Sequence, residues 1–194
     1  MHTAFQRFRL FAHEHDDVPA FHATFLVCTV LAAALFNLGF FLLLIIGHMS
    51  LDFVKYREIH HFDLKTTFKA MFLESIIDIS LFLLSLTVGI YLNHAYVLTA
   101  LSGLLRSEAT VLYAIGTIIP KVRILEDFAA VFFNFHSYLH SIHPDLQLPL
   151  SRIQHWSLKL TYVCLFFLGM TIIFFHGREM TLLNILAHEL IPAL

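Results

Sequence analysis

Long apolar runs separated by shorter polar stretches make up most of the chain, and they predict transmembrane helices. A bilayer's hydrocarbon core of about 30 Å takes about 20 helical residues. We therefore expect four spans, at residues 18–46, 70–92, 96–119 and 155–176. The first run is longer than the core is thick, so it must tilt or project. We expect it to project, which places His48 and Asp52 at its end or just past Gly47.

Short polar signals mark where these helices begin and end. Asp63 is the expected N-cap of the helix that contains the second span, and Pro120 is expected to close the third. Ser151 and Gln154 have the spacing of a capping box, which predicts the start of the last span. Gly177 is expected to end that span.

Three further segments have the mixed pattern of helices that lie on a membrane surface rather than cross it. Residues 1–17 and 121–143 are expected to be interfacial amphipathic helices, and 181–191 a short surface helix capped by Thr181. A fifth crossing would result if 124–140 spanned the bilayer. The predicted fold class is all-α: one polytopic transmembrane bundle over residues 1–194.

Composition supports this assignment, because 58% of the residues are hydrophobic and only 13% are charged. A soluble domain is about half apolar and about a quarter charged. The expected partner is the lipid bilayer, with a homo-oligomer or a membrane complex as a further expectation. The net charge of -2 gives no sign of nucleic-acid binding. Both cysteines, Cys28 and Cys164, lie in apolar runs and are expected to be buried.

The positions of lysine and arginine predict the orientation in the membrane. Basic residues at the span ends favour the cytoplasmic side. The segments 47–70 and 120–159 carry most of them, whereas the opposite side has Arg7, Arg9 and Arg178. We therefore expect a plasma (inner) membrane protein with both termini outside the cytoplasm.

Imidazole and carboxylate groups gather on the predicted cytoplasmic side, and three pairs have the i, i+4 spacing of one helix face. Acids inside an apolar segment are costly, which makes them candidates for a functional site. Imidazole and carboxylate bind zinc, manganese or iron. The predicted ligands of such a divalent metal are His48, Asp52, Glu74, Asp78, His136 and His140.

The first functional hypothesis is a metal-dependent hydrolase of a lipid-linked or phosphorylated substrate. His/acid pairs in a multi-span chain resemble those of the predicted membrane-bound metal-dependent hydrolases, without a shared continuous motif. The metal would lower the pKa of bound water and so generate a nucleophile. Arg106, Glu108 and His140 are the expected catalytic groups, with Arg106 neutralising an anionic group.

The second hypothesis is a b-type haem electron carrier, with His48 and His155 as axial ligands. The residues Arg-Ile-Gln-His-Trp at 152–156 resemble the Arg-x-x-His-Trp at the start of the haem-binding helix in cytochrome b subunits of hydrogenases and formate dehydrogenases. The capping box explains the same residues equally well.

The third hypothesis is a transport or assembly subunit that uses Glu74, Asp78, Arg106 and Glu108 as an ion relay. Discontinuous helices would support a transporter, and the sequence predicts none. A purely structural alternative carries equal weight: Arg106 pairs with Glu74 or Asp78 and the acids only hold helices together.

Overall fold

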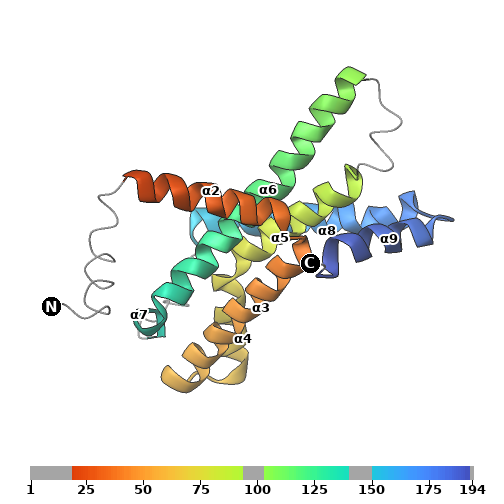
Figure 1. The fold of residues 1–194 in the computed structure, drawn as a ribbon. Coiled ribbons are helices and arrows are strands. Elements are labelled where there is room, and N and C mark those ends of the chain that lie inside the picture. Colours follow the sequence, from red (N-terminus) through yellow and green to blue (C-terminus); the bar gives the residue numbers. More distant parts are fainter. Residues whose placement is uncertain (1–18, 94–102, 140–149, 193–194) are drawn as a thin grey trace.

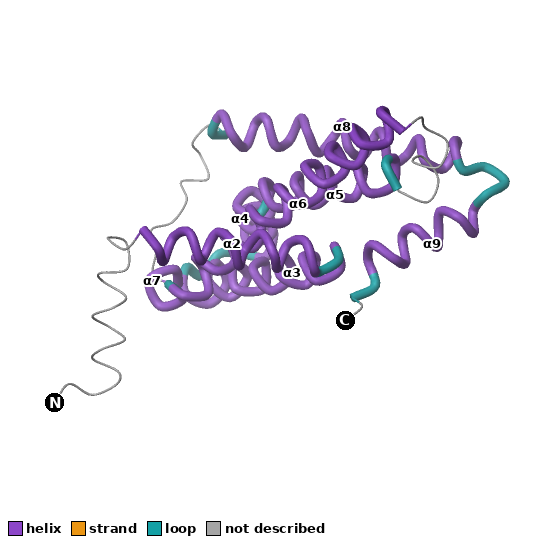
Figure 2. Tube along the Cα trace, turned by 45° about the horizontal axis from the view of Figure 1, so that its top comes forward, coloured by secondary structure: helices purple, strands orange, loops and turns teal. Residues whose placement is uncertain are grey.

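The computed structural model describes residues 19–93, 103–139 and 150–192 (Figure 1). Within these ranges every regular element is helical and no strand occurs, so the all-α prediction is confirmed (Figure 2). The predicted interfacial helix at 1–17 lies outside the described residues. The elements, in order, are α2 (Pro19–Leu35), α3 (Leu38–Val54), the π-helical turn η2 (Lys55–Ile59), α4 (Leu64–Glu74), α5 (Ile76–Tyr91), α6 (Gly103–Phe133), α7 (Phe135–Leu139), α8 (Arg152–Phe174) and α9 (Glu179–Leu190).

Helix α5 is central, because it packs against α6 and α8 and also contacts α3 and α9. The core combines apolar side chains from several helices, among them Phe41 of α3, Leu86 of α5, Ile124 of α6 and Ile185 of α9. Much of the remaining apolar surface is exposed, including most of α8. Such a surface is expected where lipid rather than protein covers the helices.

Two helices of the described chain are long and apolar enough to cross a membrane: Leu38–Ile59 and Arg152–Phe174. A third span results if the bent pair Leu64–Glu74 and Ile76–Tyr91 is counted as one. The four predicted spans are therefore confirmed only in part. The number of two or three is compatible with an integral membrane protein.

The first apolar run is not one helix, contrary to the prediction for 18–46. It breaks at Phe36 and Asn37, and Asn37 has extended backbone angles of φ -74° and ψ 170°. The Asn37 side-chain nitrogen donates to the carbonyls of Ile191 and of His188, the latter at 3.4 Å. These carbonyls lie at the C-terminal end of α9, where helix geometry leaves them without intrahelical partners. Helix α3 begins after the break, at Leu38, and continues past Gly47 to Val54. His48 and Asp52 therefore lie within this helix and not at its end.

The second apolar run begins as predicted and then breaks. Asp63 is the N-cap of α4, since its carboxylate accepts hydrogen bonds from the backbone of Lys65 and Thr66 at 3.1 and 3.4 Å. The chain then bends by 56° between Glu74 and Ile76, so the continuous helix expected up to residue 92 is wrong. Ser75 at the bend donates a hydrogen bond from its hydroxyl to a carboxylate of α3, as described below.

Pro120 does not end its helix, contrary to the prediction. Helix α6 continues through Pro120 to Phe133, so the separate amphipathic helix expected at 121–143 is wrong over its first half. A proline removes one intrahelical hydrogen bond, but tertiary packing can compensate for the loss. Here Pro120, Lys121 and Ile124 are all buried. The expected end of the amphipathic segment, residues 140–143, lies outside the described residues.

The C-terminal part follows its local signals closely. The capping box of Ser151 and Gln154 is confirmed, and α8 ends at Phe174 shortly before the turn at Gly177. The short C-terminal helix is confirmed, but it begins at Glu179 rather than after Thr181. Cys164 is buried as expected, whereas Cys28 is exposed.

Replacing Gly39 by alanine is expected to destabilise the docking of α9. A Cβ atom on Gly39 would collide with the carbonyl oxygen of Leu190, so one backbone must move. Overpacking of this kind costs about 1–3 kcal/mol. Unfolding of the purified protein in detergent, with proteolysis at α9 as a second readout, measures the effect. Gly169 of α8 is the matched control, because a Cβ there meets nothing within 4 Å.

The Asp63 cap gives a pH dependence of stability. Hydrogen bonds from Thr66, then from the Lys65 backbone, hold the pKa of Asp63 below its ordinary value of 3.8. A lowered folded-state pKa stabilises the protein above about 3.8, and this gain disappears as the pH falls through the folded-state pKa. The difference in melting temperature between wild type and Asp63→Ala should therefore shrink below that pH. Asp63→Asn can still cap the helix, and its melting temperature should not show this dependence.

Candidate metal centre

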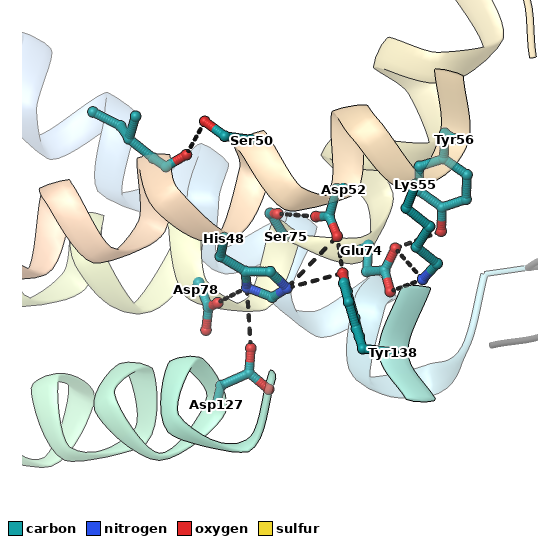
Figure 3. A network of polar contacts seen from close by, with 11 residues as sticks. His48, Ser50, Asp52, Lys55, Tyr56, Glu74, Ser75, Asp78, Asp127 and Tyr138 are labelled. Atoms are coloured by element: carbon teal, nitrogen blue, oxygen red, sulfur yellow. Dashed lines mark hydrogen bonds and ion pairs between the residues drawn. The ribbon is translucent and has the colours of Figure 1, made fainter. Parts of the chain in front are cut away.

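A histidine and two aspartates from three different helices converge in the described part of the chain (Figure 3). His48 comes from α3, Asp78 from the first turn of α5 and Asp127 from α6. The Nδ1 atom of His48 lies 3.4 Å from Asp78 Oδ2 and 3.3 Å from Asp127 Oδ2. One ligand atom from each residue lies within 4.8 Å of the others, which is a spacing that a metal ion can bridge.

The deviations from regular helices described above are what bring these residues together. The bend at Ser75 starts a new helix, and Asp78 in its first turn benefits from the positive end of the helix dipole. The continuation of α6 beyond Pro120 carries Asp127 to the same place. His48 and Asp78 are almost fully buried, whereas the Asp127 side chain is 44% exposed. The centre therefore opens to the surroundings at Asp127.

The other ring nitrogen of His48 faces a second group of side chains. Its Nε2 atom lies 3.7 Å from Asp52 Oδ1 and 3.3 Å from the Tyr138 hydroxyl (Figure 3). Tyr138 of α7 also donates a hydrogen bond to Asp52, and Ser75 donates to the second Asp52 oxygen at 3.2 Å. Metal-binding histidines commonly donate their free N–H to a carboxylate, which fixes the ring and its tautomer. Asp52 and Tyr138 are placed to do this.

A buried ion pair adjoins this group. The Lys55 ammonium donates to Glu74 at 3.0 Å, and the Tyr56 hydroxyl donates to the same carboxylate. Lys55 is only 2% exposed and lies 4.3 Å above the ring of Tyr138. Lys55 and Tyr56 begin the π-helical turn η2, a feature often found at functional sites.

The structure brings only some of the predicted metal ligands together. His48 and Asp78 lie in the centre, and Asp52 lies beside it. Glu74 does not: it pairs with Lys55, because the bend at Ser75 sends Glu74 and Asp78 in different directions although they are four residues apart. His136 belongs to α7, but its side chain is not among those described, and His140 lies outside the described residues.

The expected catalytic role of Arg106 and Glu108 is not supported. Both are exposed on the N-terminal part of α6, which projects away from the other helices (Figure 1). Arg106 is separated from Asp127 by 21 positions of the same helix, or roughly 30 Å along its axis. The same separation argues against the structural alternative in which Arg106 pairs with Glu74 or Asp78.

The haem hypothesis also loses support. Both ring nitrogens of His48 face carboxylates or a hydroxyl, surroundings that suit a hydrated divalent cation better than the apolar face of a haem. His155 is exposed on α8, just after the cap formed by Ser151.

Sequence reasoning missed Asp127, Tyr138 and Ser75. Asp127 had a usable signal, since it follows Glu126 and both acids precede the apolar stretch 128–133. Asp127 was missed because no imidazole or carboxylate lies four positions away from it in the sequence. Tyr138 and Ser75 have no distinctive sequence signal, because a hydroxyl in a membrane helix is common.

The charge balance of the centre favours a cation. Three carboxylates, from Asp52, Asp78 and Asp127, surround one imidazole. Protonation of the ring would still leave an excess of negative charge in a poorly solvated place, and a divalent cation offsets more of it. The donor set of one imidazole and carboxylates suits zinc, manganese or iron.

Comparisons with protein-family models, with curated proteins and with solved structures give no match. The fold and the centre define the class in general terms. Where the structure describes it, the chain is helical, has two or three helices able to span a membrane, and contains a His48/Asp78/Asp127 group that could hold a metal ion.

Proposed function

We propose that this protein is an integral membrane metal-dependent hydrolase that binds one divalent cation through His48 Nδ1, Asp78 and Asp127. The observation that carries the proposal is that the two ring nitrogens of His48 face different groups of side chains. Its Nδ1 atom faces two carboxylates, and its Nε2 atom faces Asp52 and Tyr138. In metal sites, one ring nitrogen of a histidine commonly binds the metal while the other donates to a group that fixes the orientation of the ring. The surroundings of His48 have this arrangement.

Hydrolysis fits this ligand set better than a purely structural role. Three protein ligands leave positions for water, as in catalytic rather than structural zinc sites. A bound divalent cation would lower the pKa of that water to about 7 and so supply a nucleophile. Asp52 and Tyr138 hold the imidazole with its proton on Nε2, which keeps Nδ1 available. The exposed side of Asp127 provides the route for a substrate.

The substrate class we propose is a lipid-linked or phosphorylated molecule that approaches from the membrane. The centre lies near the middle of the span Leu38–Ile59 and beside the break of the bent pair. The buried Lys55 ammonium lies against the ring of Tyr138, whose hydroxyl donates to Asp52. The excess of lysine and arginine in segments 47–70 and 120–159 supports a centre that faces the cytoplasm.

Metal content is the first test. Wild-type protein purified in detergent should contain about one equivalent of a divalent metal by elemental analysis, and Asp127→Asn should contain much less. Glu126→Gln is the matched control, because Glu126 is the neighbouring acid on α6 and pairs with Arg123 instead, at 3.7 Å. Equal metal content in both variants would reject the assignment of Asp127.

Hydrolysis is tested separately. Protein in vesicles that contain a phospholipid monoester or a polyprenyl diphosphate should release inorganic phosphate. A chelator should stop the release, and the divalent metal should restore it. A protein that binds metal but releases no phosphate from either lipid would retain the metal centre and lose the hydrolase proposal.

Cation transport is a second candidate, and the bend at Ser75 favours it. Transporters commonly place their ion sites at discontinuous helices near the bilayer midplane. Here the 56° break lies between two residues of the polar network, Glu74 and Asp78. Uptake of manganese or zinc into sealed proteoliposomes, without phosphate release, would select this function over hydrolysis.

A further inference from the structure

The break between α2 and α3 has polar surroundings that the metal centre does not explain. Near Phe36 and Asn37, the first apolar run leaves helical geometry, which exposes backbone carbonyls inside an apolar environment. Figures 1 and 2 place the C-terminal end of α9 beside this break, in agreement with the hydrogen bonds from Asn37 to the α9 carbonyls. Unwound carbonyls at such breaks are typical ligands of monovalent cations in membrane proteins.

A lysine ammonium already lies at the break. Lys121 of α6 is 7% exposed, and its Nζ atom donates to the Phe36 carbonyl oxygen at 3.2 Å. The same ammonium lies 5.8 Å from the centre of the Phe41 ring. A buried lysine is costly, and it is retained where a nearby anion or oxygen ligands compensate.

An acidic side chain, Glu189 of α9, lies in the same region: burial lowers the pKa of Lys121, and the charge of Glu189 partly offsets this by favouring the ammonium form. Glu189 is only 6% exposed, and its Oε1 atom accepts a hydrogen bond from the Tyr113 hydroxyl at 3.1 Å. Gly89 of α5 makes room for the carboxylate, since a Cβ atom at Gly89 would lie 3.4 Å from Glu189 Cδ. His188 Nδ1 lies 3.8 Å from Glu189 as the remaining titratable neighbour, but it is exposed.

An oxygen without a partner completes the set. The Oδ1 atom of Asn37 is buried and accepts no hydrogen bond from any described residue. The carbonyl oxygens of His188 and Ile191 can only accept hydrogen bonds, so the atom of the Asn37 amide that faces them is the nitrogen. This assignment fixes the position of Asn37 Oδ1. A buried acceptor without a donor costs free energy, and a cation ligand would remove that cost.

We propose that the α2–α3 break is a monovalent-cation site in which the Lys121 ammonium is the resident, tethered cation. When Lys121 releases its proton to solvent, Na⁺ takes its place against the Phe36 carbonyl, Asn37 Oδ1 and the Glu189 carboxylate. One positive charge leaves and one enters, so the charge of the site is unchanged. This site lies apart from the His48 centre, and the proposal does not depend on the proposed hydrolysis.

The test removes the resident cation. Lys121→Met, purified as the full chain in detergent, should melt several degrees higher in NaCl than in choline chloride at equal ionic strength. The double variant Lys121→Met/Glu189→Gln should lose this difference, although glutamine can still accept the hydrogen bond from Tyr113. Lys159→Met, at an exposed lysine of α8, is the control and should respond to neither salt. Equal melting of Lys121→Met in both salts would overturn the proposal.

A second measurement covers the case in which Lys121→Met does not fold. Wild-type protein should gain stability from Na⁺ over choline at pH 10 but not at pH 6, because only loss of the lysine proton opens the site. Glu189→Gln should remove the gain at pH 10, whereas Glu179→Gln, at an exposed position of the same helix, should keep it. No response of the wild type to Na⁺ at either pH would contradict the proposal.

Discussion

Replacing His48 by alanine is expected to abolish binding of the divalent metal, whereas Asp52→Asn should weaken it by about 10- to 100-fold. The difference follows from which ring nitrogen each change affects. The first change removes the proposed ligand atom Nδ1. The second leaves every ligand in place but removes the negative charge that faces Nε2 at 3.7 Å. Isothermal titration with zinc or manganese measures both effects.

His188→Ala is the control for this experiment, because His188 is 80% exposed and lies on α9. It should bind metal as wild type does. If Asp52→Asn abolished binding as completely as His48→Ala, Asp52 would be a ligand and not a support for His48. If neither variant changed the affinity, the metal centre itself would be wrong. Melting temperatures of all three variants separate these outcomes from misfolding.

Two capping signals, Asp63 and Ser151, predicted helix starts correctly because the hydrogen bonds involved join residues close in sequence, although Thr181 did not. Asp63 caps α4 through residues two and three positions later, and Ser151 caps α8 through Gln154. Such contacts are decided within one helical turn, so the sequence contains them in full.

The two helix breaks could not be predicted in this way, because distant residues stabilise them. Asn37 bonds to carbonyls at the end of α9, more than 150 positions away. Ser75 bonds to Asp52, a residue of α3. A serine or asparagine inside an apolar run has no local feature that distinguishes a break from a continuous helix. The error at Pro120 had a different cause. A proline usually ends or kinks a helix, but here the packing of the surrounding residues stabilises a continuous helix.

The candidate site depended on these same points. His48 and Asp78 were identified because an imidazole and a carboxylate in apolar segments are unusual. Glu74 was assigned to the wrong group because its i, i+4 relation to Asp78 has meaning only within one continuous helix. Asp127 was missed because it belongs to no pair of acids or histidines with i, i+4 spacing. Residue type was therefore a better guide to the site than spacing, since spacing inherits every error in the helix boundaries.

Lys55→Met is expected to cost about 3 kcal/mol of stability, the low end of the range for breaking a buried ion pair. The change leaves the Glu74 carboxylate without its ammonium partner at 3.0 Å, in a place where water reaches only part of it. The side chain of Glu74 is 30% exposed and keeps its hydrogen bond from Tyr56, which limits the loss. Unfolding free energies in mixed micelles measure the effect.

The double variant Lys55→Met/Glu74→Gln should be more stable than Lys55→Met alone, because a neutral amide accepts the Tyr56 hydrogen bond without an unpaired charge. Arg123→Met is the comparison for an exposed pair, since the side chains of Arg123 and Glu126 are 67% and 34% exposed, and it should cost less than about 1 kcal/mol. Purely additive losses in the double variant would mean that Lys55 stabilises the protein by packing against the ring of Tyr138 and not by charge. The two explanations also predict different metal binding. If the charge of Lys55 holds Glu74 away from the His48 centre, Lys55→Met should change the affinity for the divalent metal. If Lys55 acts by packing alone, the affinity should not change.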